Sequence, residues 1–120
     1  MNSLEIGHSG EQAAQQYLLK NGFELLHSNW RNGRYELDIV ASKDGMLHVI
    51  EVKTRKADSL TPPEMAMTRK KFKSLCKAAD FYIQLYHIDS DVQFDLICVD
   101  YENGDTYNIR YIPDVMSAIW

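Results

Sequence analysis

Two dipeptides that favour tight turns, Asn32-Gly33 and Asp44-Gly45, divide the first half of the chain into three strand-like runs. The runs cover residues 23–30, 35–42 and 47–54, and the third is dense in β-branched side chains. An Asn-Gly or Asp-Gly pair between such runs typically joins antiparallel neighbours through a two-residue turn. The first half of the chain is therefore expected to form a three-stranded antiparallel meander.

Two segments outside the meander have the apolar spacing of helices. Ser9 begins a capping-box pattern, which predicts a first helix of about three turns that ends at Asn21-Gly22. Over residues 69–87, apolar side chains recur at three- and four-residue steps, and lysines occupy the other face. This pattern predicts a second, amphipathic helix with Thr68 as its N-cap.

The last third of the chain returns to strand-like sequence. Residues 92–101 and 106–112 flank the turn-forming pair Asn103-Gly104, and Pro113 can open a short terminal helix. Pro62-Pro63 ends regular structure before the second helix. The predicted order is αβββαββ, an α/β fold in which helices flank a mixed central sheet.

Composition favours one ordinary folded domain over residues 1–120, because 45% of the residues are hydrophobic and 25% are charged. A chain of this length buries roughly two-thirds of its unfolded surface. Its apolar runs fall short of the roughly 20 residues of a membrane helix, and residues 1–10 lack the pattern of a signal peptide. Cys76 and Cys98 lack metal-ligand spacing and are expected to be buried thiols. We therefore expect a cytoplasmic protein that does not span a membrane.

Charge is distributed unevenly along the chain. The net charge is -4, but residues 53–77 contain eight of the thirteen basic residues and have a local charge of +6. A basic face of this kind would attract a polyanion such as DNA, although a solvated helix flank explains the lysines equally well. The residues expected to contact nucleic acid are Arg55, Arg69, Lys70, Lys71 and Lys73.

Carboxylates occupy positions that should be partly buried. Glu51 and Lys53 are two residues apart on the third strand, so they share a face at a distance of about 7 Å. Glu36 and Asp38 share a face of the neighbouring strand, and Glu11 lies on the inner stripe of the first helix. Converging buried carboxylates are costly unless a cation neutralises them. Their hard oxygen ligands favour Mg²⁺, with Mn²⁺ as a substitute.

An E-x-K tripeptide is weak support by itself, because seven glutamates and eight lysines in this chain produce one by chance about half the time. The neighbouring Asp38 and the inner-face Glu11 give it context. Structural explanations compete for each residue. Asp38, Glu51 and Lys53 can form an ion-pair cluster, Glu11 can stabilise the helix dipole, and Glu36 can belong to an exposed salt bridge.

Several short motifs follow one another along nearly the whole chain. They are Gly10-Glu11 with Ala14, Asn29-x-Arg31, Glu36-Leu37-Asp38-Ile39-Val40-Ala41, Glu51-Val52-Lys53-Thr54-Arg55, Lys71 and Phe94-Asp95. In order and spacing these motifs resemble those of the YraN-type uncharacterised bacterial family. Two positions depart from its pattern: Tyr35 stands where many members have glycine, and Gln93 stands where arginine is frequent.

That family is similar to the restriction-endonuclease-like, or PD-(D/E)xK, superfamily, whose D...E-x-K site lies on an αβββαβ core. It also resembles archaeal Holliday-junction resolvases, which carry an added glutamate on the first helix. The resemblance implies that Asp38 and Glu51 are metal-binding carboxylates, Lys53 is the site lysine and Glu11 is the helix carboxylate. Asp95, within an apolar run, is expected to be structural.

The leading hypothesis is a magnesium-dependent nuclease that hydrolyses DNA in a branched, damaged or single-stranded form. Glu36 would contribute to a second metal position. A rival hypothesis is a non-catalytic module of the same fold that binds nucleic acid or a protein. A third is a subunit that requires a protein partner for activity. A homodimer would double the small DNA-reading surface of one such domain.

Overall fold

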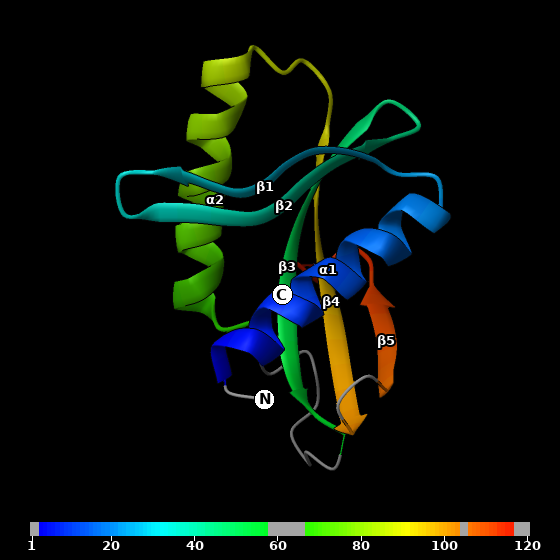
Figure 1. Ribbon diagram of the computed structural model, residues 1–120. Coiled ribbons are helices and arrows are strands. Elements are labelled where there is room, and N and C mark those ends of the chain that lie inside the picture. The colour runs from blue at the N-terminus through cyan, green and yellow to red at the C-terminus, as the bar shows by residue number, and fades with distance from the viewer. Residues whose placement is uncertain (1–2, 58–66, 104–105, 117–120) are drawn as a thin grey trace.

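The computed structural model describes residues 3–57, 67–103 and 106–116 of the chain (Figure 1). Its elements follow the predicted order αβββαββ. They are α1 (Ser3–Lys20), β1 (Glu24–Asn32), β2 (Tyr35–Lys43), β3 (Met46–Lys56), α2 (Arg69–Tyr86), β4 (Val92–Asn103) and β5 (Thr106–Ile112).

The strands form one sheet in the order β1-β2-β3-β4-β5. Neighbours are antiparallel except β3 and β4, which are parallel. A parallel pair needs a crossover connection, and α2 supplies it between β3 and β4. The mixed central sheet flanked by helices, predicted from the sequence, is therefore confirmed.

The antiparallel meander of β1, β2 and β3 is also confirmed; its second turn is at Asp44-Gly45 as predicted, whereas its first is at Gly33-Arg34, one residue later than predicted. Asp44 and Gly45 both have positive φ angles, 52° and 78°, as a type I′ hairpin turn requires. Gly33 has a φ of 61° in the first turn. The strands extend one to two residues beyond most of the predicted limits, because pairing continues to the turns.

The predicted start of the first helix was wrong. The helix begins at Ser3, so Ser9 lies inside it and is not an N-cap. A capping-box pattern fits any serine with Gln three residues later, including one in a helix interior. The predicted end was correct, since Gly22 follows the helix with a φ of 85°. Gly10 lies inside α1 at a point where this helix approaches β3 closely. A Cβ at this position would overlap the Thr54 hydroxyl, so only glycine fits here without a shift.

The two faces of the sheet contribute to two cores. On one side α1 packs Ala14 and Leu18 against strand residues such as Ile50. On the other side α2 packs residues such as Phe72 and Leu75 against strand residues such as Val49. Because side chains alternate along a strand, Glu51 follows Val49 on the α2 face, while His48 lies on the α1 face.

The second helix, α2, begins after the predicted cap. Thr68 has extended backbone angles, and its hydroxyl oxygen accepts a hydrogen bond from the Lys71 amide. His87 ends the helix in the left-handed conformation, with a φ of 53°. Cys76 and Cys98 are free thiols, as expected, but only Cys98 is buried, and Cys76 is partly exposed. Among the described helices, none is long and apolar enough to cross a membrane.

Three predicted features lie wholly or partly outside the described residues. The break at Pro62-Pro63 is outside them, and only the first residue of the turn at Asn103-Gly104 is inside. After Pro113, residues 115 and 116 are helical at the end of the described chain.

Candidate functional site

The strands β2 and β3 separate in the middle of the sheet. Their ladder runs from the turn to the pair Ile39–Ile50 and stops there. Beyond this point β2 stays paired with β1, and β3 stays paired with β4. Figure 1 shows the result: the β1–β2 hairpin crosses over α2, whereas β3 continues beside β4. We call this point of separation the fork.

Asp38 and Glu51 are the first residues beyond the last β2–β3 pair, and the register would place them opposite each other. One carboxylate oxygen of Asp38 accepts a hydrogen bond of 2.9 Å from the Val52 amide. The two carboxyl groups are also in hydrogen-bonding contact with each other. The fork therefore brings together two acids, from neighbouring strands, that the sequence singled out.

Both acids hold their protons more tightly than usual. Burial is the main reason that the pKa of Asp38 is raised, and the Val52 amide opposes it. Burial, followed by the charge of Asp38, raises the pKa of Glu51 to about 7, although the Lys71 ammonium acts in the opposite direction. Two carboxylates that share one partly buried place cannot both ionise without a compensating cation.

A lysine from α2 supplies part of that compensation. The Lys71 ammonium is 2.6 Å from a carboxylate oxygen of Glu51, whose side chain is only 12% exposed. Lys53 lies on the same face of β3 as Glu51 but is exposed, and among the described residues it forms no ion pair. Lys71 was predicted as a nucleic-acid contact, and the sequence did not indicate that it would pair with Glu51.

Glu36 borders this site. It forms an exposed ion pair of 3.1 Å with Arg31, its partner across β1 and β2. Its charge also contributes to the raised pKa of Asp38. With Glu51 and Lys71 it lines a hollow of about 140 Å³. A role for Glu36 at a second metal ion stays a prediction.

Glu11 is half-buried on α1, next to Gly10, which packs against Thr54. Within the described part of the chain, no three His, Cys, Asp or Glu side chains gather closely enough to hold a metal ion by themselves. At the fork, the described part of the chain thus offers a metal ion the pair Asp38 and Glu51. The predicted role of Glu11 stays a prediction.

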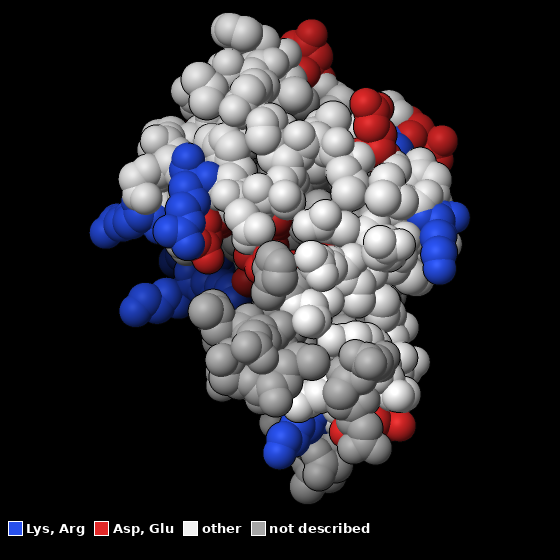
Figure 2. Space-filling view, in the orientation of Figure 1, with Lys and Arg blue, Asp and Glu red and all other residues white. Residues whose placement is uncertain are grey.

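A cationic groove lies next to the fork. We use this name for the hollow of about 380 Å³ between α2 and the β1–β2 hairpin. Figure 2 shows basic side chains gathered on the side of α2 and this hairpin, beside acidic side chains in a depression. The groove is lined by Arg34, Tyr35, Lys70, Lys73, Ser74 and Lys77.

Lys70 and Lys73 were predicted nucleic-acid contacts, whereas Arg34 and Lys77 were not singled out. Lys77 could have been found as part of the basic segment. Arg34 lies in the β1–β2 turn, 36 residues before Lys70, so no local pattern connects it with the groove.

Two other predicted contacts lie outside the groove lining. Arg69 is exposed at the start of α2. Arg55 is 3.1 Å from a carboxylate oxygen of Asp100, and its side chain is only 17% exposed. Asp100 also pairs with Arg110 at 2.7 Å. Arg55 is thus less available to phosphate than the exposed lysines of α2.

A different acidic centre lies on the α1 face. Asp95 is fully buried within the sheet and accepts hydrogen bonds from His48, Tyr111 and Gln93 side chains, at 2.7 to 2.8 Å, and from the Asp114 amide at 2.9 Å. This is the structural role predicted for Asp95. The sequence did not identify His48 as its partner, because the two residues are 47 positions apart.

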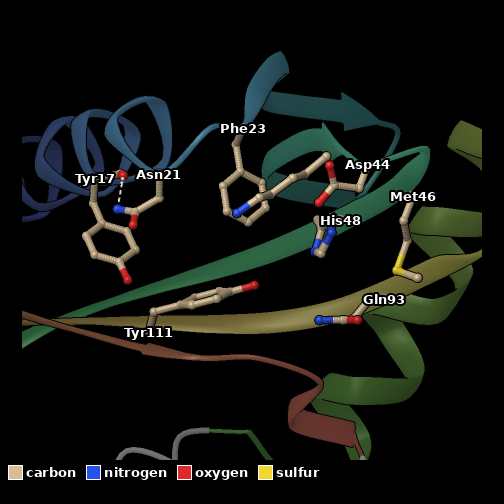
Figure 3. Close-up of a pocket in the computed structure, with 9 residues that line it drawn as sticks. Tyr17, Asn21, Phe23, Asp44, Met46, His48, Gln93 and Tyr111 are labelled. Atoms are coloured by element: carbon tan, nitrogen blue, oxygen red, sulfur yellow. Dashed lines mark hydrogen bonds between the residues drawn. The ribbon is translucent and has the colours of Figure 1, made fainter.

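The side chains held by Asp95 border a further hollow of about 340 Å³ (Figure 3). Tyr17, Phe23 and Tyr111 provide aromatic walls, and the Lys43 ammonium lies 4.9 Å from the Phe23 ring centre. None of the acids proposed for the fork lines this hollow.

These observations define a mixed α/β protein with an αβββαβ core and a five-stranded mixed sheet flanked by two helices. The chain belongs to the uncharacterised protein family UPF0102, whose sequence pattern matches residues 10–99. This confirms the family resemblance carried by the motifs.

Relatives in that family match most of the chain. It is similar to the UPF0102 protein of Bacteroides thetaiotaomicron, with 46% identity over 110 residues, 92% of this chain and 90% of the relative. It is also similar to the UPF0102 protein of Parabacteroides distasonis, with 45% identity over 115 residues, 95% of this chain and 93% of the relative. The Phocaeicola vulgatus UPF0102 protein is 43% identical over 117 residues, 97% of this chain and 96% of the relative.

Proposed function

We propose that this protein is a magnesium-dependent nuclease that hydrolyses phosphodiester bonds of branched, damaged or single-stranded DNA. The observation that carries the proposal is the acid pair at the fork. Asp38 and Glu51 are partly buried, share a hydrogen bond and have raised pKa values. Such a pair destabilises the folded state, and a cation would relieve the repulsion between its two carboxylates.

The donor chemistry of the pair fits a hard divalent ion. Mg²⁺ is commonly held by one or two carboxylates, with waters and substrate phosphate as its other ligands. Asp38, Glu51 and the backbone carbonyl of Val52 would hold Mg²⁺ or Mn²⁺. When bound, such an ion polarises the scissile phosphate and lowers the pKa of a bound water.

The two lysines near Glu51 have different proposed tasks. Lys71 contacts the Glu51 carboxylate directly and favours its ionised form. Lys53 lies exposed on the same strand face, where its ammonium would donate to the phosphate and stabilise charge that develops during the reaction. Glu36 borders the hollow and would help to hold a second ion, and Glu11 would position an ion from α1.

The second candidate is a non-catalytic nucleic-acid-binding module. The cationic groove favours it, because a groove lined by four basic side chains can hold a phosphate backbone without cleaving it. We also propose that the protein lies in the cytoplasm and that it acts with a protein partner or as a homodimer.

A cleavage assay with paired variants tests the proposal. Purified protein is incubated with labelled duplex, single-stranded, flap and four-way-junction DNA in Mg²⁺, Mn²⁺ or chelator. The wild type should cleave at least one DNA form with metal and none with chelator. Asp38→Asn should abolish cleavage, whereas Asp44→Asn, an exposed acid in the β2–β3 turn, should not.

The binding module becomes the better account if the wild type binds DNA but cleaves no form. The assignment of the site fails if the Asp38→Asn variant cleaves at the wild-type rate.

A further inference from the structure

We propose that the cationic groove binds single-stranded nucleic acid, with phosphates on its basic side chains and an unpaired base against Tyr35. This names the substrate class of the proposed nuclease, and it rests on that function only for the cleavage step, not for binding. The strand would lie between α2 and the β1–β2 hairpin and lead to the acid pair at the fork.

The basic side chains of the groove face one another across it. Lys70, Lys73 and Lys77 are three and four residues apart, so they lie along one face of α2 over about 10 Å. Arg34 comes from the hairpin on the opposite side, and among the described residues no acidic side chain lines the groove. Four neighbouring positive charges repel one another, and an anionic backbone between them would relieve that repulsion.

An aromatic pair lies at the same place. The ring centres of Tyr35 and Phe81 are 5.5 Å apart, and Phe81 is 42% exposed although it is a large apolar side chain. The Arg34 guanidinium is 5.2 Å from the Tyr35 ring centre and donates a hydrogen bond of 3.1 Å to its hydroxyl. Tyr35 is half-buried and lines the groove, so the accessible part of its ring can stack on an unpaired base, as aromatic rings among cations do on surfaces that bind single strands.

The groove is continuous with the fork. Arg34 and Ser74 line both the cationic groove and the hollow of about 140 Å³ that contains Glu51. Because the Glu51 side chain is only 12% exposed, a phosphate has to enter this recess to reach it. A flexible single strand can enter, whereas the bases of an intact duplex are paired and offer no free face to Tyr35.

Fluorescence anisotropy in EDTA measures binding without cleavage. The probes are a labelled 15-nucleotide oligothymidylate and a labelled duplex of the same length. We expect the single strand to bind at least about tenfold more tightly than the duplex at equal salt. Tyr35→Leu should weaken single-strand binding about tenfold, within the range for one base stacked on an aromatic ring. Lys77→Gln should lower the slope of log affinity against log salt by about 0.7.

Matched controls lie away from the groove. Lys43→Gln removes a lysine that contacts Phe23 on the α1 face, and Tyr107→Leu removes a half-buried tyrosine of β5. Both should bind the single strand as the wild type does. If thermal melting shows that Tyr35→Leu is unfolded, Phe81→Leu tests the same stack from the other ring.

Two results would overturn the inference: duplex binding that equals or exceeds single-strand binding, or unchanged single-strand affinity in the groove variants. The outcome is separable from that of the cleavage assay. Asp38-dependent cleavage together with preferred duplex binding would remove only this inference. Single-strand binding that depends on Tyr35, without any cleavage, would remove only the nuclease.

Discussion

Two buried acidic centres of this protein differ in the hydrogen-bond donors that surround them. Asp95 accepts four hydrogen bonds from three side chains and one amide. At the fork, Asp38 and Glu51 receive one backbone amide and one lysine from the described part of the chain, and each faces the other acid. The comparison teaches that burial alone does not identify a functional carboxylate. A fully supplied carboxylate stabilises the fold, whereas repulsion within an under-supplied pair would be relieved by a cation, as we propose for the fork.

Substitution of one acid in each centre should give the largest contrast. Asp95→Asn replaces an acceptor of four hydrogen bonds by an amide that cannot accept them all, so we expect a loss of about 3 kcal/mol in unfolding free energy. Asp38→Asn, in chelator, should leave stability unchanged or raise it, because it removes like-charge repulsion. Urea denaturation measures both. Equal losses in the two variants would abolish the distinction between the centres.

A divalent metal ion should stabilise the protein only through the acid pair at the fork. Mg²⁺ or Mn²⁺ should raise the thermal midpoint of the wild type, by an amount equivalent to about 2.7 kcal/mol at a hundredfold excess over the dissociation constant. Asp38→Asn should lose most of this response, whereas Asp44→Asn should keep it. Differential scanning calorimetry with and without EDTA measures the effect, and an undiminished response in Asp38→Asn would place the ion elsewhere.

The pH dependence of stability should distinguish Glu51 from other acids. Its pKa is raised from 4.5 to about 7 by folding, so the native state binds more protons than the unfolded state between these values. The contribution of Glu51 to stability without metal should therefore be greatest below pH 4.5, fall as the pH rises to about 7, and then level off.

Glu51→Gln is the matched variant for this test. Its stability relative to the wild type should increase over the same pH range, by about 1.4 kcal/mol for each unit of pKa shift. Urea denaturation at several pH values in EDTA measures the difference. A difference that is constant between pH 4.5 and 8 would show that Glu51 is not under strain at the fork.

Much of the fold can be predicted from local sequence, but the contacts that separate the two centres cannot. The turn pair Asp44-Gly45 and the helical spacing of residues 69–87 identify their elements because each pattern is contained in a few neighbouring residues. The Lys71–Glu51 contact joins residues 20 positions apart, and the His48–Asp95 contact joins residues 47 apart. Such pairs depend on strand order and on where a ladder stops.

The acids at the fork were predictable for a related reason. Polar residues inside two apolar strand runs are conspicuous, and one tight turn makes those strands neighbours. Their position just beyond the last β2–β3 pair could not be predicted. The separation of β2 from β3 depends on the course of the β1–β2 hairpin over α2, which no local pattern encodes.

The smallest effect on stability is expected from the basic surface, outside both centres. Replacing Arg69, Lys70 and Lys73 by Gln should change unfolding free energy by no more than about 0.5 kcal/mol, because these side chains are exposed. The same variant should weaken DNA binding across sequences and lower the salt slope by about 0.9 per lost duplex contact or 0.7 per single-strand contact. Anisotropy at several salt concentrations measures this. Unchanged affinity and slope would favour a protein partner over nucleic acid.

The central claim is that the acid pair at the fork holds a catalytic metal ion, and one paired experiment on three proteins tests it most directly. Mn²⁺ binding by titration calorimetry and DNA cleavage are measured on the same samples of wild type, Lys53→Ala and Asp38→Asn. We predict that Lys53→Ala binds Mn²⁺ as the wild type does but does not cleave, since its ammonium acts on the phosphate, and that Asp38→Asn does neither. Wild-type Mn²⁺ affinity in Asp38→Asn, or undiminished cleavage by Lys53→Ala, would contradict the account.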